Sequence, residues 1–184
     1  MTRDEMIQAY SSAGRHYHDL AHIEDCLAKL DRVASLSARD REILEHAIWW
    51  HDVVYDPART DNEERSAQAA EQNLAPDLRD EVARLIRLTR THDVAPGDHL
   101  GAILISIDLS VLGADAATYD AYAAAIRREF SHVPEEAYRQ GRAAVLERFA
   151  ARPVIYPDAG FAAELDGRAR ANIARELAAL RTAG

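Results

Sequence analysis

The chain is poor in cysteine and has no long apolar run. Cys26 is the only cysteine among 184 residues, so the chain can form no internal disulfide and no zinc site built from four cysteines. The longest apolar run, Ala102 to Ile107, is far too short to cross a bilayer. The first twelve residues lack the apolar stretch of a secretory signal. We therefore expect a cytoplasmic protein that does not enter membranes.

Basic residues are outnumbered by acidic ones. The 22 Lys and Arg residues face 31 Asp and Glu residues, which gives a formal net charge of −9, and Lys29 is the only lysine. Binding to a nucleic-acid backbone needs a basic face, so this balance argues against a nucleic-acid polymer as partner. A small phosphate ligand stays compatible, because it needs only a local cluster of positive charge or a metal ion. A homo-oligomer is compatible with the same composition.

Apolar residues recur at helical spacing along nearly the whole chain, and the alternation typical of strands is lacking. Helix starts are predicted at Ser37 with Asp40, at Asp61 with Glu64 as the better capping box, and after Pro134. The apolar stripes occupy residues 23–34, 43–50, 78–89, 119–130 and 161–180. The sequence therefore predicts an all-α fold.

One segment is ambiguous. Residues 103–107, Ile-Leu-Ile-Ser-Ile, are rich enough in β-branched side chains to form a strand. A single strand cannot form a sheet by itself, so we predict a buried helix here.

The dipeptide His51-Asp52 is the first candidate for chemistry, because His51 continues the apolar face that Ala47 and Ile48 define. An imidazole and a carboxylate at the end of one helix could meet at one metal ion. The alternative is a buried, hydrogen-bonded histidine followed by a turn. Asp108 shares a helix face with Leu104 and Val111, and a carboxylate buried there would need either a metal, an arginine partner or a helix end to cap.

Further histidines could join these residues. His22 lies beside the apolar stripe of its helix, and His18, His22 and Cys26 follow at intervals of four residues, so they could share a face. Alternatively, His18 precedes the helix and flanks the site. His92 follows Leu88 by four residues and could also point inward.

Taken in order, the histidines and carboxylates read as H, HD and D, and the chain resembles the HD superfamily of metal-dependent phosphohydrolases. It is most similar to the bacterial subgroup described as predicted metal-dependent HD-family phosphohydrolases. Four blocks carry the resemblance: RHYH followed by HI (15–23), AIWWHDVVY (47–55), DNEERSA (61–67) and DLSVLG (108–113). The resemblance implies one HD-type helical domain over residues 1–184, with a motif-bearing core at about 15–113 and C-terminal helices 115–182 packed on it.

The resemblance also implies a metal centre. His22, His51, Asp52 and Asp108 match the family's ligand positions for a divalent ion, such as Mn, Fe, Co, Ni, Zn or Mg. Some relatives hold a second metal with additional histidines, a role open to His92 and His99. Relatives often carry another carboxylate two positions before the last ligand, where this chain has Ser106.

The expected reaction is hydrolysis of a small phosphoester, plausible substrates being nucleotides, by metal-activated water. Asp52 would orient that water, and Glu64 would act as general acid unless it only begins a helix. Arginine suits a phosphate, with Arg15 as the first candidate. Arg127 and Arg142 are further candidates, although both could equally lie on solvated helix faces. Rival hypotheses are a di-iron oxygenase and a non-catalytic module that binds a metal or nucleotide for regulation.

Overall fold

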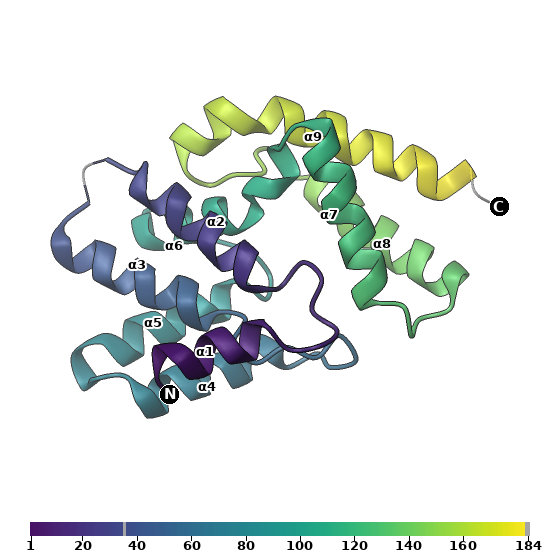
Figure 1. Cartoon of the computed structure of the whole chain (residues 1–184). Helices are drawn as coiled ribbons and strands as arrows, with labels where there is room; N and C mark the ends of the chain where they lie inside the picture. The colour runs from purple at the N-terminus through teal and green to yellow at the C-terminus, as the bar shows by residue number, and fades with distance from the viewer. Residues whose placement is uncertain (35, 183–184) are drawn as a thin grey trace. The chain divides into compact units, whose positions relative to one another are not determined.

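The structure is a computed structural model that describes residues 1–34 and 36–182; Ser35 and the last two residues of the expected domain lie outside this part. The described residues form nine α-helices and one short 3₁₀ helix, η1, and contain no strand (Figure 1). The all-α prediction is therefore confirmed. Residues 103–107 lie inside a helix, as predicted.

The helices fall into two compact units, of which the first is Met1–Asp108 and the second begins at Leu109. The first unit contains α1 (Arg3–Tyr10), α2 (Leu20–Asp31), α3 (Ala38–Trp50), α4 (Asn62–Asn73), α5 (Pro76–Leu88) and α6 (His99–Asp108). The second contains η1 (Leu109–Gly113), α7 (Ala116–Glu129), α8 (Glu135–Ala150) and α9 (Ala159–Thr182). That the C-terminal helices pack on the core stays a prediction.

Helix α3 is the centre of the first unit, because it packs against α2, α4, α5 and α6. Its apolar side chains Leu44, Ile48 and Trp50 are almost completely buried. Helix α6 is buried on nearly all sides, as an apolar helix must be. The C-terminal end of α3 and the C-terminal end of α6 thus both lie within this unit's core, where a polar side chain needs a partner.

Capping differs in detail from the prediction. Ser37 caps α3, and its hydroxyl accepts a hydrogen bond from the Asp40 amide at 3.0 Å. Asp61 precedes α4 as predicted but makes no side-chain capping bond. The reason is that both Asp61 carboxylate oxygens accept hydrogen bonds from Arg59, each at 2.7 Å.

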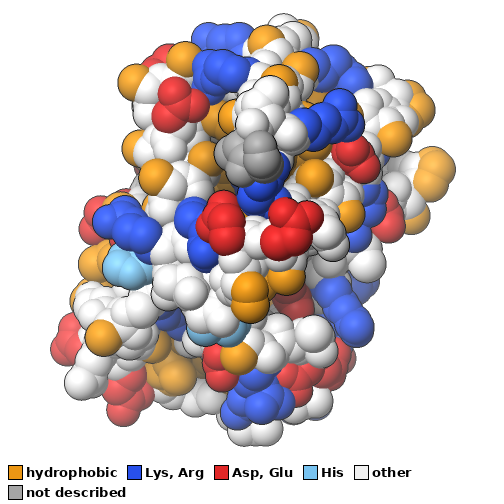
Figure 2. Space-filling model, turned by 90° about the vertical axis from the view of Figure 1, so that its right-hand side faces the viewer, with side chains coloured by type: hydrophobic (Ala, Val, Ile, Leu, Met, Phe, Trp, Pro, Cys, Tyr) orange, Lys and Arg blue, Asp and Glu red, His pale blue; other side chains and the backbone are white. Residues whose placement is uncertain are grey.

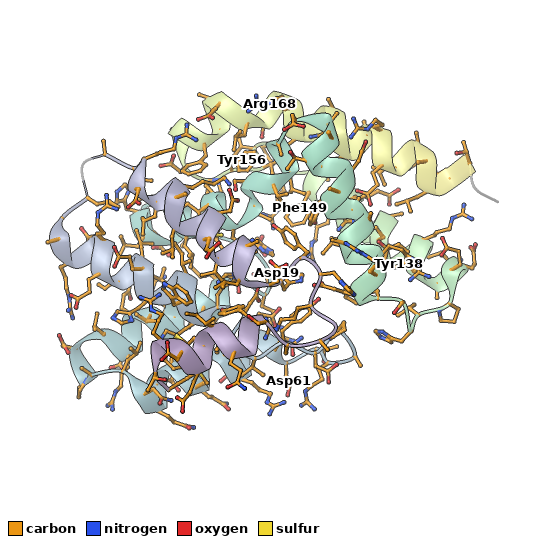
Figure 3. All side chains as sticks on the ribbon, in the orientation of Figure 1. Asp19, Asp61, Tyr138, Phe149, Tyr156 and Arg168 are labelled. Carbon is orange, nitrogen blue, oxygen red and sulfur yellow. The ribbon has the colours of Figure 1, made fainter. Side chains whose placement is uncertain are left out.

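The second unit is built around α9, which packs against η1 and α8. The buried Asn172 amide donates to the carbonyls of Leu112 and Ala114, at 2.9 and 3.0 Å. Arg168, labelled with Tyr156 in Figure 3, donates to the Gly113 carbonyl at 2.9 Å. These bonds fasten η1 to α9.

The surface carries both signs of charge. On the face shown in Figure 2, acidic and basic side chains are interspersed. In the part of the chain that the structure describes, no single helix is long and apolar enough to span a membrane, although the bent pair His99–Gly113 and Ala116–Glu129 meets the same length and composition test.

Candidate metal centre

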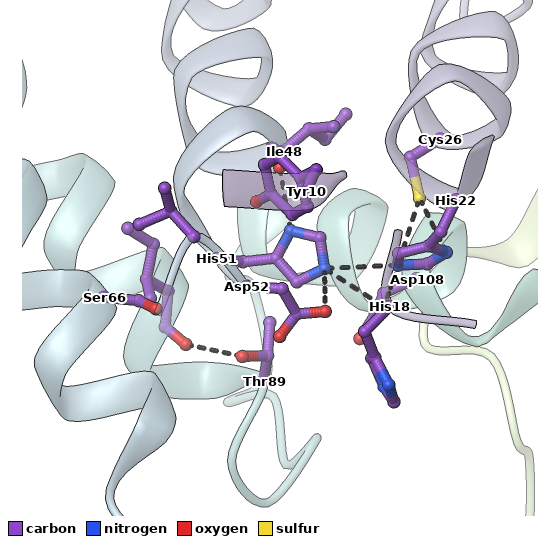
Figure 4. Close-up of polar contacts among 12 residues, drawn as sticks. Tyr10, His18, His22, Cys26, Ile48, His51, Asp52, Ser66, Thr89 and Asp108 are labelled. Atoms are coloured by element: carbon purple, nitrogen blue, oxygen red, sulfur yellow. Dashed lines mark hydrogen bonds and ion pairs between the residues drawn. The ribbon is translucent and has the colours of Figure 1, made fainter. Parts of the chain in front are cut away.

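Three side chains from separate helices converge inside the first unit: His22, His51 and Asp108 (Figure 4). His22 lies in the first turn of α2, His51 caps the end of α3, and Asp108 is the last residue of α6. Each offers one ligand atom, and these atoms all lie within 4.8 Å of one another. Both histidines are buried. This group could hold a metal ion.

The spacing of the ligand atoms fits one cation. His22 Nε2 lies 3.3 Å from His51 Nε2 and 3.4 Å from Asp108 Oδ1, and His51 Nε2 lies 3.6 Å from the same oxygen. Nitrogen and oxygen ligands about 2.1 Å from one ion stand roughly 3.0–3.4 Å apart at right or tetrahedral angles. The three separations are close to that range, so the residues fit a first-row divalent ion.

The His51 ring is oriented by the backbone of its own helix. Its Nδ1 lies 2.8 Å from the Ile48 carbonyl oxygen, which can only accept, so Nδ1 carries the hydrogen. Nε2 is then the atom that faces His22 and Asp108. A ligand histidine that donates its other N–H to a carbonyl is the usual arrangement at protein metal sites.

Two more predicted residues border this group. Asp52 Oδ2 lies 3.1 Å from His51 Nε2, which places the carboxylate beside the same ligand atom. His92 Nε2 lies 3.1 Å from Asp108 Oδ2, the oxygen that does not face His22. His92 has a φ of 56°, uncommon for a residue with a side chain, and its amide donates to the Leu88 carbonyl just past α5.

The imidazoles and carboxylates of this group each favour the charged form of the other. Burial would raise the pKa of Asp108, but hydrogen bonds from His22, His51 and His92 outweigh it and hold the pKa well below its ordinary value. Burial would lower the pKa of His51, but the Asp52 and Asp108 carboxylates outweigh it and raise the pKa. The neighbours of Asp108 are thus imidazoles rather than an arginine. A proton on His51 and a cation would compete for the same lone pair.

Cys26 lies behind His22, with its sulfur 3.8 Å from both ring nitrogens. The thiol is buried, and burial raises its pKa well above the ordinary value.

His18 precedes α2, whose N-cap is Asp19, so it flanks the group rather than sharing a helix face with His22.

Arg15 contacts the backbone of the candidate site. Its Nη1 donates to the carbonyls of His18 and Asp52, each at 2.8 Å, and its Nη2 donates to the Val53 carbonyl at 3.0 Å. The guanidinium also lies over the rings of Tyr10 and Tyr55. These contacts hold the loop before α2 against the chain after α3.

Glu64 forms a two-point ion pair with Arg87 on α5, at 2.7 and 2.8 Å. Hydrogen bonds from Arg87 lower the pKa of Glu64 to about 2. A group that is ionised at neutral pH has no proton to donate, so we leave Glu64 out of the proposed chemistry.

The remaining candidates are not among the three converging ligands. His99 is exposed at the first turn of α6, and its nine-residue separation from Asp108 corresponds to about 13 Å along the helix axis. Arg127 donates to Glu135 and to the Phe130 carbonyl. Arg142 is buried in the second unit, where it pairs with Glu176 at 2.8 and 3.1 Å.

Sequence reasoning missed two polar residues of α4. Asn62 and Ser66 are buried and both bond to the backbone that follows His51-Asp52. The available signal was their spacing of four residues on one helix face, within the block 61–67 that carries part of the resemblance.

Comparisons with known proteins identify no relative: no protein-family model, no curated protein and no solved structure matches the chain. Membership of the HD superfamily therefore stays a prediction from the four sequence blocks.

Proposed function

We propose that this chain binds a divalent cation through His22, His51, Asp52 and Asp108 and hydrolyses a small phosphoester. One observation carries the proposal: ligand atoms from the ends of three helices lie within 4.8 Å of one another in a buried position. Imidazoles and carboxylates converging without an arginine are expensive to bury unless a cation compensates the carboxylates.

The donor set restricts the ion. Two imidazole nitrogens and two carboxylates, with no thiolate among them, suit Mn, Fe, Co, Ni or Zn better than Ca. When bound, such an ion lowers the pKa of a coordinated water and polarises a phosphoryl oxygen.

The protein residues have separate tasks around that ion. The carbonyl of Ile48 fixes the ring of His51 so that Nε2 faces the centre. Asp52, whose second oxygen is not engaged with His51, accepts a hydrogen bond from the attacking water and orients it. Arg15 fixes the backbone of Asp52, so its task is to position this carboxylate.

Metal analysis of the purified protein tests the first half of the proposal, and a phosphatase screen over small phosphoesters with the metal found tests the second. Asp108→Asn should lose both the metal and the hydrolysis. His99→Ala is the matched control, because it removes an exposed histidine from the other end of the same helix and should change neither. Wild-type metal content in Asp108→Asn would refute the ligand assignment.

A two-iron oxygenase is the second candidate. It is favoured by the contact of His92 with Asp108 Oδ2, because Asp108 could then offer one oxygen to each of two ions. It predicts two iron atoms per chain, an electron paramagnetic resonance signal in the mixed-valence state, and loss of one iron in His92→Ala. A single metal per chain with phosphatase turnover would exclude it.

A further inference from the structure

The segment that directly follows His51 is held in place by side-chain hydrogen bonds rather than by helix or strand hydrogen bonds. Residues 52–56 follow α3 and precede α4, and belong to no helix or strand. On one side, Arg15 binds the carbonyls of Asp52 and Val53. On the other side, two residues of α4 bind the next part of the segment. The position of Asp52 is therefore set by a small number of identifiable hydrogen bonds.

Ser66 and Asn62 each make a reciprocal pair of bonds to this segment. The Ser66 hydroxyl accepts from the Val54 amide at 3.1 Å and donates to the Val54 carbonyl at 3.2 Å. The Asn62 side chain accepts from the Asp56 amide at 3.1 Å and donates to the Asp56 carbonyl at 2.9 Å. Each side chain thus substitutes for a neighbouring strand, satisfying both polar groups of one residue.

The two pairs are in register. Residues four apart on a helix are separated by about 6 Å along its axis, and residues two apart in any chain lie at most about 6.6 Å apart, the value for a strand. Asn62 and Ser66 are four apart, while Val54 and Asp56 are two apart. The face of α4 that carries Asn62 and Ser66 therefore matches the spacing of Val54 and Asp56, and slipping by one residue would break all four bonds.

This register sets the positions of two residues of the segment, Asp52 and Tyr55. Asp52 begins the segment, with its carboxylate 3.1 Å from His51 Nε2. Tyr55, between the two clamped residues, stacks on His18 with ring centroids 4.3 Å apart. Both buried polar side chains of α4 thus act on the candidate metal centre through the backbone.

We propose that Asn62 and Ser66 are positioning residues, whose reciprocal bonds to Asp56 and Val54 set the Asp52 carboxylate for metal binding. The inference rests on the proposed function, because it assigns Asp52 to the metal. It also gives the 61–67 block a task that does not involve Glu64.

Cobalt binding tests the inference. Asn62→Ala and Ser66→Ala should bind Co²⁺ about 10- to 100-fold more weakly than the wild type, the usual effect of losing the outer support of a metal ligand. At saturating Co²⁺ their visible absorption spectra should also differ from the wild-type spectrum, because a displaced Asp52 changes the ligand field. A loss of stability alone would leave the spectrum of the loaded protein unchanged.

Asn172→Ala is the matched control. It removes another buried asparagine that binds two backbone carbonyls, in the second unit, and should bind Co²⁺ like the wild type. Variants of Asn62 and Ser66 that match this control in affinity and spectrum would overturn the inference.

Amide hydrogen exchange separates this inference from the proposed function. If wild-type protein binds no Co²⁺, the proposed metal function fails. The Val54 and Asp56 amides of the same protein should nevertheless be protected, and rapid exchange of both in the folded wild type would overturn the clamp even if neither variant can be purified.

Discussion

One nitrogen of Arg15 donates to two carbonyls that are far apart in the sequence, those of His18 and Asp52. The bond to Asp52 joins the loop before α2 to the end of α3. It therefore connects the segment that leads to His22 with the segment that carries His51. With the bond to Val53 and the flanking Tyr10 and Tyr55 rings, this side chain is a structural clamp at the candidate site.

Replacing that clamp should cost stability. Arg15→Lys cannot serve three carbonyls with one ammonium, so we expect the free energy of unfolding in urea to fall by about 2–3 kcal/mol. Arg39→Lys, which alters the exposed ion pairs of Arg39 with Glu42 and Asp77, is the control and should leave the free energy of unfolding close to that of the wild type. Unchanged stability combined with a raised KM would instead assign Arg15 to phosphate binding.

His92 combines a positive φ with a side chain that contacts Asp108. Both His92→Gly and His92→Ala remove the imidazole and should weaken metal binding equally. Because only glycine adopts this backbone conformation without strain, the glycine variant should be more stable than the alanine variant by about 1 kcal/mol. Equal unfolding midpoints would show that the backbone at this position is relaxed.

Glu64→Gln should leave kcat within about twofold of the wild type, because the ionised, Arg87-bound carboxylate has no proton to give. A steady-state assay on whichever phosphoester the screen identifies checks this. A fall in kcat of a hundredfold or more would reinstate Glu64 as general acid.

The metal-free protein should be most stable in mildly acidic solution. The folded pKa of His51 is raised above 6.5, so its contribution is complete below that pH and is lost as the pH rises through the folded pKa. The folded pKa of Asp108 is lowered below 3.8, so its contribution is complete above that pH and is lost in acid. Urea unfolding between pH 3 and 9 with a chelator present should show the free energy of unfolding falling both in acid and at alkaline pH. His51→Gln should reduce the fall at alkaline pH.

Removing one partner of the Arg142–Glu176 ion pair should lower the free energy of unfolding much more than replacing both partners. Arg142→Met leaves the Glu176 carboxylate, only 11% exposed, with the Tyr119 hydroxyl bond but without its charged partner, and we expect a loss of about 3–5 kcal/mol. Arg142→Met combined with Glu176→Met should recover most of this loss. A double variant as unstable as the single one would show that other bonds of this network dominate.

The sequence predicted the helices well because apolar spacing along a helix is local information. The convergence of His22, His51 and Asp108 was expected from the family resemblance, and the apolar faces that His51 and Asp108 continue agree with it. Partners could not be predicted in the same way. The sequence around an arginine on an Ala-rich helix looks the same whether that arginine binds a phosphate or a carboxylate. The pairing of Arg142 with Glu176 depends on the packing of α8 on α9, which the local sequence does not show.

The miss at α4 has a similar cause. Glu64 drew attention because a carboxylate is chemically reactive, whereas Asn62 and Ser66 resemble ordinary helix-surface residues. Their burial depends on the path of residues 52–56, and no periodicity in the sequence describes a segment without helix or strand.

The order of the ligands along the chain has a mechanical consequence. His22 lies in the second helix of the first unit and Asp108 is the unit's last residue, so an ion held by both would act as a crosslink that closes a loop spanning nearly the entire unit. Crosslinks over long loops restrict the unfolded chain most. Cation loading would then govern how readily the N-terminal half unravels, and the melting temperature would rise with metal concentration.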